Sequence, residues 1–119
     1  MNQKELLEQL KKEDCLDTLQ HYIKQVIDMR GFGKQSVEHE LLLLTEEIGE
    51  LAKAIRKDKV NMGVDQNKIQ NYDSMESEVA DVFIVLVSIC NTLGISLYDA
   101  LIEKERQNIE RTWKTITSV

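Results

Sequence analysis

Apolar residues recur three and four positions apart along most of the chain, which is the period of one face of an α-helix. Four segments show this pattern, with a break in the first near Asp14: residues 2–29, 36–57, 73–93 and 96–115. The third segment is apolar almost all round, so we expect it at the centre of the fold. Helices joined by mostly short connections pack antiparallel. We therefore predict an all-α protein built as an antiparallel four-helix bundle.

Residues that interrupt helices stand between these segments. Gly31 and Gly33 flank Phe32 directly after the first segment, and Gly94 follows the third. Glycine is a frequent helix terminator, so both places are expected turns. Residues 58–72 contain one glycine, three asparagines and few large apolar side chains. We expect this stretch to be a loop.

The composition is that of a globular protein and not of a disordered chain. Of the 119 residues, 30% are charged and 42% are hydrophobic. This length is sufficient for one hydrophobic core and too short for two, so we expect a single domain over residues 1–119. Aspartate and glutamate number 21 against 15 lysines and arginines, which gives a net charge of −6. Because nucleic-acid polymers are held mainly by basic side chains, we do not expect one as a partner.

The cysteines and the apolar runs bear on the expected location. Cys15 and Cys90 are too far apart for a metal-binding spacing and favour a reducing compartment over a disulfide framework. Cys90 lies in an apolar stretch and is expected in the core. The longest unbroken apolar run, residues 82–87, is far too short to span a bilayer. We expect a cytoplasmic protein that does not contact a membrane.

Two pairs of carboxylates lie where a soluble helix normally has apolar side chains. Glu47 and Glu50 share a face beside the apolar stripe of the second segment, and Glu78 and Asp81 share a face of the third. Asp81 has little polar surface to occupy on so apolar a helix, and an unpaired buried carboxylate is costly. Oxygen ligands suit Mg²⁺, which keeps coordination positions free for phosphates. Either pair alone is a common pattern, but the second pair favours a cation site.

The fourth segment changes character along its length. Its stripe begins with apolar residues and continues with Lys104, Asn108 and Arg111. Lysine and arginine can neutralise phosphate charge, and asparagine can bind a phosphate, a sugar or a base edge. A salt-bridged surface helix has the same spacing, so both interpretations remain open at this point.

The order of these motifs resembles the all-α nucleoside triphosphate pyrophosphohydrolases of the MazG type. That family combines E-x-x-E, a spacer and E-x-x-D, and residues 47–50 and 78–81 match the two parts. It often continues with a lysine and an asparagine four positions apart, as at Lys104 and Asn108. The similarity extends from about Leu16 to about residue 113, nearly the whole chain.

This resemblance implies an activity and an assembly. The expected reaction is the Mg²⁺-dependent hydrolysis of a nucleoside triphosphate, usually a deoxynucleotide or a noncanonical nucleotide, to the monophosphate and pyrophosphate. Mn²⁺ is expected to substitute for Mg²⁺, and the implied role is sanitation of the nucleotide pool. Family members are homodimers or homotetramers. On this resemblance the four paired carboxylates hold the metal, and Lys104 and Asn108 bind the substrate. Arg111 is expected to bind phosphate because of its charge.

Three further residues are candidates for the substrate chemistry. Glu46 stands one position before the ligand face, where it either orients or deprotonates a water molecule or is a surface acid. His21 and Phe32 lie where the resemblance places residues that contact the base. His21 also fits an exposed helix position. An aromatic residue between two glycines either fills the core or faces a ligand.

Other hydrolase classes do not fit the sequence. Residues 46–49 are similar to part of the Nudix signature, but Leu42 and Leu43 replace the upstream Arg-Glu and no strand-rich fold is predicted. Neither the Glu-x-x-His motif of di-iron bundles nor an adjacent His and Asp is present. A non-catalytic dimerisation or regulatory module with a vestigial acidic cleft fits the apolar pattern equally well. The expected burial of Asp81 argues against that alternative.

Overall fold

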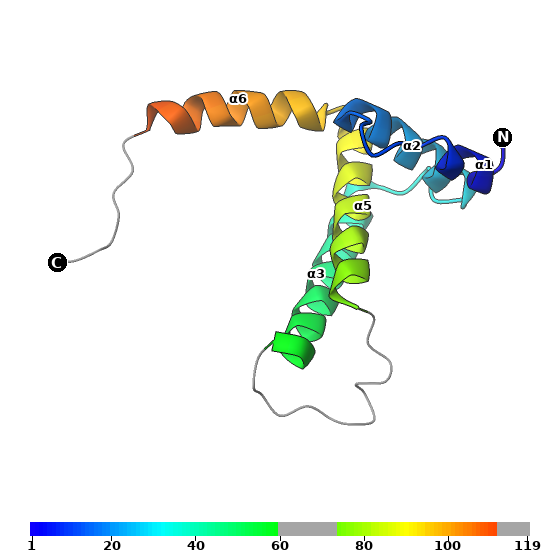
Figure 1. Cartoon of the computed structure of the whole chain (residues 1–119), viewed down its shortest axis with the longest axis horizontal. Helices are drawn as coiled ribbons and strands as arrows, with labels where there is room; N and C mark the ends of the chain where they lie inside the picture. Colours follow the sequence, from blue (N-terminus) through cyan, green and yellow to red (C-terminus); the bar gives the residue numbers. More distant parts are fainter. Residues whose placement is uncertain (60–73, 112–119) are drawn as a thin grey trace.

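The computed structural model describes residues 1–59 and 74–111, which form five α-helices and, within these ranges, no β-strand. In chain order the helices are α1 (Gln3–Glu8), α2 (Leu16–Met29), α3 (Val37–Lys59), α5 (Met75–Leu93) and α6 (Leu97–Glu110) (Figure 1). The prediction of an all-α fold is confirmed. Because α3 continues to Lys59, it is slightly longer than expected. The rest of the predicted loop and the predicted helix end near Thr115 lie outside the described residues.

The first predicted helix is divided into α1 and α2. The backbone N–H of Lys11 donates a hydrogen bond to the Asp14 carboxylate, with 2.7 Å between Lys11 N and Asp14 Oδ2. A short acidic side chain that bonds to the backbone in this way competes with helical hydrogen bonding. The break expected near Asp14 is therefore confirmed.

Serine side chains define where α3, α5 and α6 begin. Ser36, Ser74 and Ser96 each accept a hydrogen bond from the backbone N–H three residues further on, at 3.2, 3.1 and 3.2 Å respectively. Such a cap satisfies one of the N–H groups that a helix start leaves without an intrahelical partner. A cap of this kind stabilises a helix by about 1 kcal/mol.

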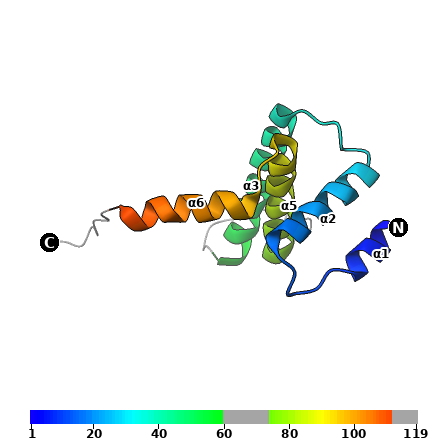
Figure 2. The ribbon, with the colours of Figure 1, turned by 90° about the horizontal axis from the view of Figure 1, so that it is seen from above.

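The antiparallel pair of α3 and α5 forms the centre of the molecule, and α2 packs across α5 (Figures 1 and 2). The most buried apolar side chains lie where these helices meet. Val87 of α5 is fully buried, Ala54 of α3 is 1% exposed, and Val26 and Ile23 of α2 are 2% and 4% exposed. Cys90 also lies in this core, as predicted, and burial raises the pKa of its thiol.

A sharp corner separates α6 from α5, and the two helices are bent by 94°. Gly94 makes the turn with φ of +69°, a left-handed conformation that glycine adopts readily. Gln20 of α2 secures the corner, because its Oε1 accepts a hydrogen bond from Leu97 N at 2.7 Å and its Nε2 donates one to Ile95 O at 3.0 Å. As a result α6 extends away from the other helices (Figure 1). It therefore does not close a four-helix bundle with α3 and α5 of the same chain.

Many large apolar side chains remain exposed on α3, α5 and α6, and no described residue of α6 is buried. Those more than a third exposed on these helices are Leu41, Leu42, Ile48, Ile55, Val79, Leu86, Leu93, Tyr98, Leu101 and Ile109. Single exposed apolar residues are normal, but extended apolar surface marks a site of interaction. Among the described helices none is by itself long and apolar enough to cross a membrane, and only α5 and α6 taken together reach that length.

Candidate metal centre

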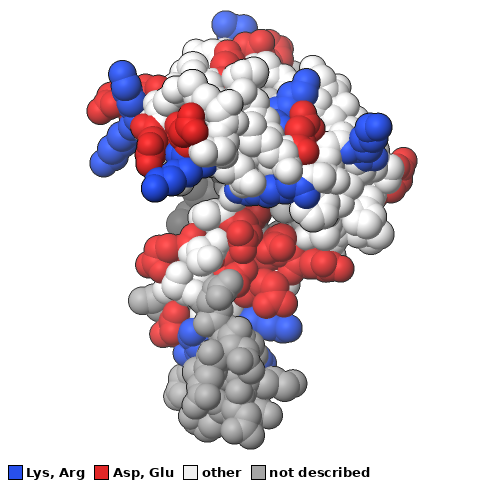
Figure 3. Space-filling model, turned by 90° about the vertical axis from the view of Figure 1, so that its right-hand side faces the viewer, with Lys and Arg blue, Asp and Glu red and all other residues white. Residues whose placement is uncertain are grey.

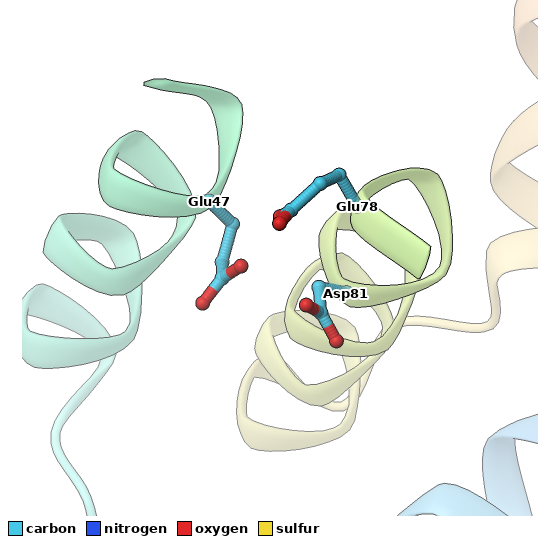
Figure 4. Close-up of side chains that lie close together, drawn as sticks. All are labelled: Glu47, Glu78 and Asp81. Atoms are coloured by element: carbon cyan, nitrogen blue, oxygen red, sulfur yellow. The ribbon is translucent and has the colours of Figure 1, made fainter. Parts of the chain in front are cut away.

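Three carboxylates from two helices meet in the space between α3 and α5. Glu47 projects from α3, and Glu78 and Asp81 project from α5 toward it (Figure 4). One oxygen atom of each carboxylate lies within 4.8 Å of the corresponding atoms of the other two. On a larger scale, Asp and Glu side chains gather in a band across the middle of one face of the molecule (Figure 3). The structure thus brings together three of the four carboxylates that the sequence singled out as metal ligands.

The antiparallel packing of α3 on α5 produces this cluster. Glu78 and Asp81 lie one turn apart on the same face of α5, and Glu47 faces them from α3. Glu78 is 5% exposed, whereas Asp81 is only half-buried. The expectation that Asp81 is buried was therefore wrong. Helical periodicity identifies a shared face, but it does not tell which position on that face a neighbouring helix covers.

Glu50 and Glu46 lie outside the cluster in this arrangement. The Glu50 side chain is 49% exposed, and its Oε1 lies 3.5 Å from Nζ of Lys53. Glu50 follows Glu47 by three residues, so its side chain leaves the helix about 60° around the axis from that of Glu47. Glu46 is also exposed. The ligand role of Glu50 and the water-orienting role of Glu46 remain predictions.

The clustered carboxylates fit a hard divalent cation. Mg²⁺ prefers six oxygen ligands at about 2.1 Å, so oxygens that share the ion lie roughly 3 to 4 Å apart. Carboxylate oxygens already within 4.8 Å of one another reach that spacing by small side-chain rotations. Carboxylates this close repel one another, and a bound cation offsets that repulsion. Glu47, Glu78 and Asp81 are therefore the residues that would hold a metal ion.

We expect a divalent cation to raise the temperature of thermal unfolding. A ligand present at 100 times its Kd that binds only the folded state stabilises that state by about 2.7 kcal/mol, which corresponds to several degrees for a chain of this size. Calorimetric scans in EDTA, Mg²⁺ and Mn²⁺ measure this shift. Glu78→Gln should abolish it, whereas Glu76→Gln, at an exposed position of the same helix, should retain it. Equal shifts in the two variants would contradict the assignment.

A largely apolar cavity of about 260 Å³ lies along the contact between α3 and α5, which we call the α3–α5 seam. Leu43 lines it one helical turn from Glu47, and Val85 lines it one turn from Asp81. The cavity therefore begins next to the carboxylate cluster. Its lining residues are Ile27, Phe32, Gln35, His39, Glu40, Leu43, Ile84, Val85 and Ser88.

The turn after α2 holds Phe32 at the wall of this cavity. Gly31 adopts φ of +87°, a left-handed conformation that favours glycine, and the Asp28 carboxylate lies against Gly33. Phe32 is 51% exposed and also borders a smaller neighbouring cavity. An aromatic side chain here is suitably placed to face a ligand. His21 instead lines a separate cavity between α1 and α2, so the structure does not bring it together with Phe32.

The predicted phosphate-binding residues of α6 stay distant from the carboxylates of the same chain. Lys104 and Arg111 are exposed, and Asn108 is half-buried. The distance along α5 from Glu78 to the corner at Gly94 is roughly 24 Å at 1.5 Å per residue. Beyond that corner α6 turns through 94° and extends away (Figure 1). The sequence could not show this, because the direction of α6 depends on tertiary contacts.

Sequence reasoning missed a polar cluster around one buried carboxylate. Glu40 of α3 is 3% exposed and accepts hydrogen bonds from the hydroxyls of Ser88 and Thr92 of α5. A signal for it exists in the sequence: Glu40 precedes Glu47 by two helical turns, and Ser88 follows Asp81 by two turns. Polar residues at these positions interrupt otherwise apolar faces.

Comparison with known proteins agrees with this architecture. Residues 35–113 match the MazG nucleotide pyrophosphohydrolase domain. The chain is 42% identical over 60 residues to the uncharacterized protein YpjD of Bacillus subtilis (strain 168), a match that covers 48% of this chain and 50% of YpjD. The chain thus aligns with about half the length of that curated relative.

A solved structure extends the similarity to most of the chain. The crystal structure of YPJD from Bacillus subtilis, a proposed pyrophosphatase, has a TM-score of 0.72 to this structure at 27% identity. The match covers 86% of this chain and 100% of that one. Both the predicted all-α class and the predicted resemblance are thereby confirmed. The chain belongs to the MazG nucleotide pyrophosphohydrolase domain family.

Proposed function

We propose that this protein hydrolyses nucleoside triphosphates, either deoxynucleotides or noncanonical ones, to the monophosphate and pyrophosphate in the presence of Mg²⁺. Mn²⁺ is proposed to substitute. Membership of the family supports a nucleotide pyrophosphohydrolase activity in general. The observation that carries the finer proposal is the cluster of Glu47, Glu78 and Asp81 next to an apolar cavity. Removal of noncanonical or excess nucleotides from a cytoplasmic pool is the role that follows from this reaction.

The residues of the chain bind and orient the substrate in this proposal. Glu47, Glu78 and Asp81 hold the cation, which when bound supplies positive charge to the phosphoryl oxygens and activates the attacking water. Phe32 offers an aromatic face to the base in the cavity. Fixing the two ends of the substrate orients the phosphoanhydride bond and removes much of the entropic part of the barrier.

We further propose that a second copy of the chain completes the site, in a homodimer or a homotetramer. The exposed apolar side chains of α3, α5 and α6 require a partner surface to bury them. In a two-fold assembly the α6 helix of each chain lies over the α3–α5 seam of the other. Lys104, Asn108 and Arg111 then approach the phosphates of a substrate bound at the partner's carboxylates.

A panel of nucleoside triphosphates tests the proposed reaction. The protein is incubated with Mg²⁺ and each common or noncanonical triphosphate, and pyrophosphate and orthophosphate are assayed separately. We expect pyrophosphate and the monophosphate as the first products. Orthophosphate as the first product would mean attack at the γ-phosphate and would contradict the proposal. No product from any triphosphate would instead favour the non-catalytic helical module.

A further inference from the structure

Glu40 is a buried carboxylate in the wall of the candidate substrate cavity. Only 3% of the residue is exposed, although its side chain lines both the cavity of about 260 Å³ and a smaller one of about 80 Å³ beside it. Phe32 also lines both cavities. A charged group in this position is unusual, because Asp and Glu are rarely buried without a charged partner.

The hydrogen bonds of Glu40 hold it in place and still leave acceptor capacity. Ser88 Oγ donates to Oε2 at 2.6 Å, and Thr92 Oγ1 donates to Oε1 at 2.5 Å. An ionised carboxylate has about four acceptor positions and no donor. In the described part of the chain no cationic side chain forms an ion pair with Glu40. The carboxylate is thus oriented by two hydroxyls and remains able to accept further hydrogen bonds.

The position of Glu40 relative to the metal centre is set by the α3–α5 pairing. Glu40 lies seven residues from Glu47, and Ser88 lies seven residues from Asp81, which in each helix is two turns or roughly 10.5 Å. Leu43 and Val85 line the apolar cavity between these two levels. The seam therefore has carboxylates for a cation at one end, apolar walls in the middle and a hydrogen-bond acceptor at the other end. A nucleotide has the matching order of phosphates, sugar and base.

We propose that Glu40 is a specificity-determining residue that accepts hydrogen bonds from the base, and that the substrates are nucleotides whose base carries an exocyclic amino group. This inference rests on the proposed function, because it places the phosphates at Glu47, Glu78 and Asp81. Adenine, cytosine and guanine each present an amino group on the edge opposite the sugar. Thymine and uracil present one ring N–H flanked by two carbonyl oxygens, which a carboxylate repels.

The burial of Glu40 makes this discrimination strong. A site built to hydrogen-bond one polar group rejects an analogue without that group, since its own buried polar atoms are then left unsatisfied. If the carboxylate were exposed, water would replace the hydrogen bond that such a base does not make, at little cost in free energy. The hydroxyls of Ser88 and Thr92 also restrict the carboxylate to one orientation, so it cannot turn away from an unfavourable base.

The test compares kcat/KM for dATP, dCTP, dGTP, dTTP and dUTP in the wild-type protein, in Glu40→Gln and in Glu38→Gln. Glu38 is exposed on the same helix and serves as the matched control. We expect the wild type to prefer at least one amino-bearing base over dTTP and dUTP by about tenfold or more. Glu40→Gln should reduce that ratio by about tenfold, because an amide can also donate to a carbonyl oxygen. Glu38→Gln should leave the ratio unchanged.

A second measurement keeps the inference testable if Glu40→Gln does not fold. Binding of α,β-methylene dCTP, dGTP and dUTP to the wild-type protein with Mg²⁺, followed by calorimetry, should show the same order of affinity. Hydrolysis without preference for an amino base, or an equal loss for all five substrates in Glu40→Gln, would overturn the specificity role alone. Failure of every triphosphate to release pyrophosphate would overturn the proposed function, and this inference with it.

Discussion

Replacement of Glu78 by glutamine is expected to abolish pyrophosphate release while the protein remains folded. Glu78 is the most buried member of the carboxylate cluster, and glutamine has nearly the same shape without the negative charge. Loss of groups that merely support metal ligands costs 10- to 100-fold in affinity or activity, so loss of a ligand should cost at least about 100-fold. Initial rates with Mg²⁺ and a good triphosphate substrate, beside circular dichroism of both proteins, measure the two effects.

A similar loss of activity is expected at the other two positions of the cluster. Glu47→Gln and Asp81→Asn should each lower activity to a comparable degree, because all three carboxylates converge on one point. Glu76→Gln on the exposed side of α5 is the matched control and should retain nearly full activity. Normal turnover in both Glu78→Gln and Asp81→Asn would show that the metal site lies elsewhere.

Mixing two inactive variants is expected to restore activity if α6 serves the site of a partner. Lys104→Ala should be inactive because it removes a cation from the phosphate site, and Glu78→Gln because it damages the metal site. In a two-fold dimer with random exchange, half of the dimers are mixed and each of these has one intact site, which predicts roughly one quarter of the wild-type rate per chain. The measurement is the rate after equal amounts of the two variants are unfolded and refolded together.

A matched mixture controls for non-specific recovery. Glu78→Gln mixed with Glu47→Gln should stay inactive, because both substitutions affect the same cluster and every site in a mixed dimer then carries one of them. Recovery in this control would indicate that mixing restores activity for another reason. Failure of the Lys104→Ala and Glu78→Gln pair to recover, with subunit exchange demonstrated, would place α6 at the site of its own chain.

Local sequence signals were sufficient to predict the helices and where they begin. The break near Asp14 follows from a side chain that bonds to the backbone three residues earlier, and the start of α6 follows from the hydroxyl of Ser96. These interactions form within a few residues of the chain, so sequence patterns report them directly. The extension of α3 to Lys59 was missed, since helix ends are the least determined part of such a pattern.

The candidate site was only partly accessible from the same signals. The spacing of Glu78 and Asp81 predicted that they share a face, and the structure adds Glu47 from α3 to that pair. Glu50, at an equivalent spacing from Glu47, lies outside the cluster and pairs with Lys53. Glu40 was overlooked because its partners, Ser88 and Thr92, are about fifty residues away in the chain. Contacts over that separation depend on which turn of α3 faces which turn of α5.

The sequence by itself determined that this protein is helical, where its described helices begin, and which carboxylates share helix faces. Those features depend on hydrogen bonds and periodicities confined to one helix. Only the tertiary structure decided that Glu47 meets Glu78 and Asp81, that Glu40 lies two turns further along the same seam, and that α6 points away from its own chain. These three features depend on the pairing of α3 with α5 and on the contacts of Gln20 at the corner between α5 and α6. In both places, side chains distant in the sequence pack against one another.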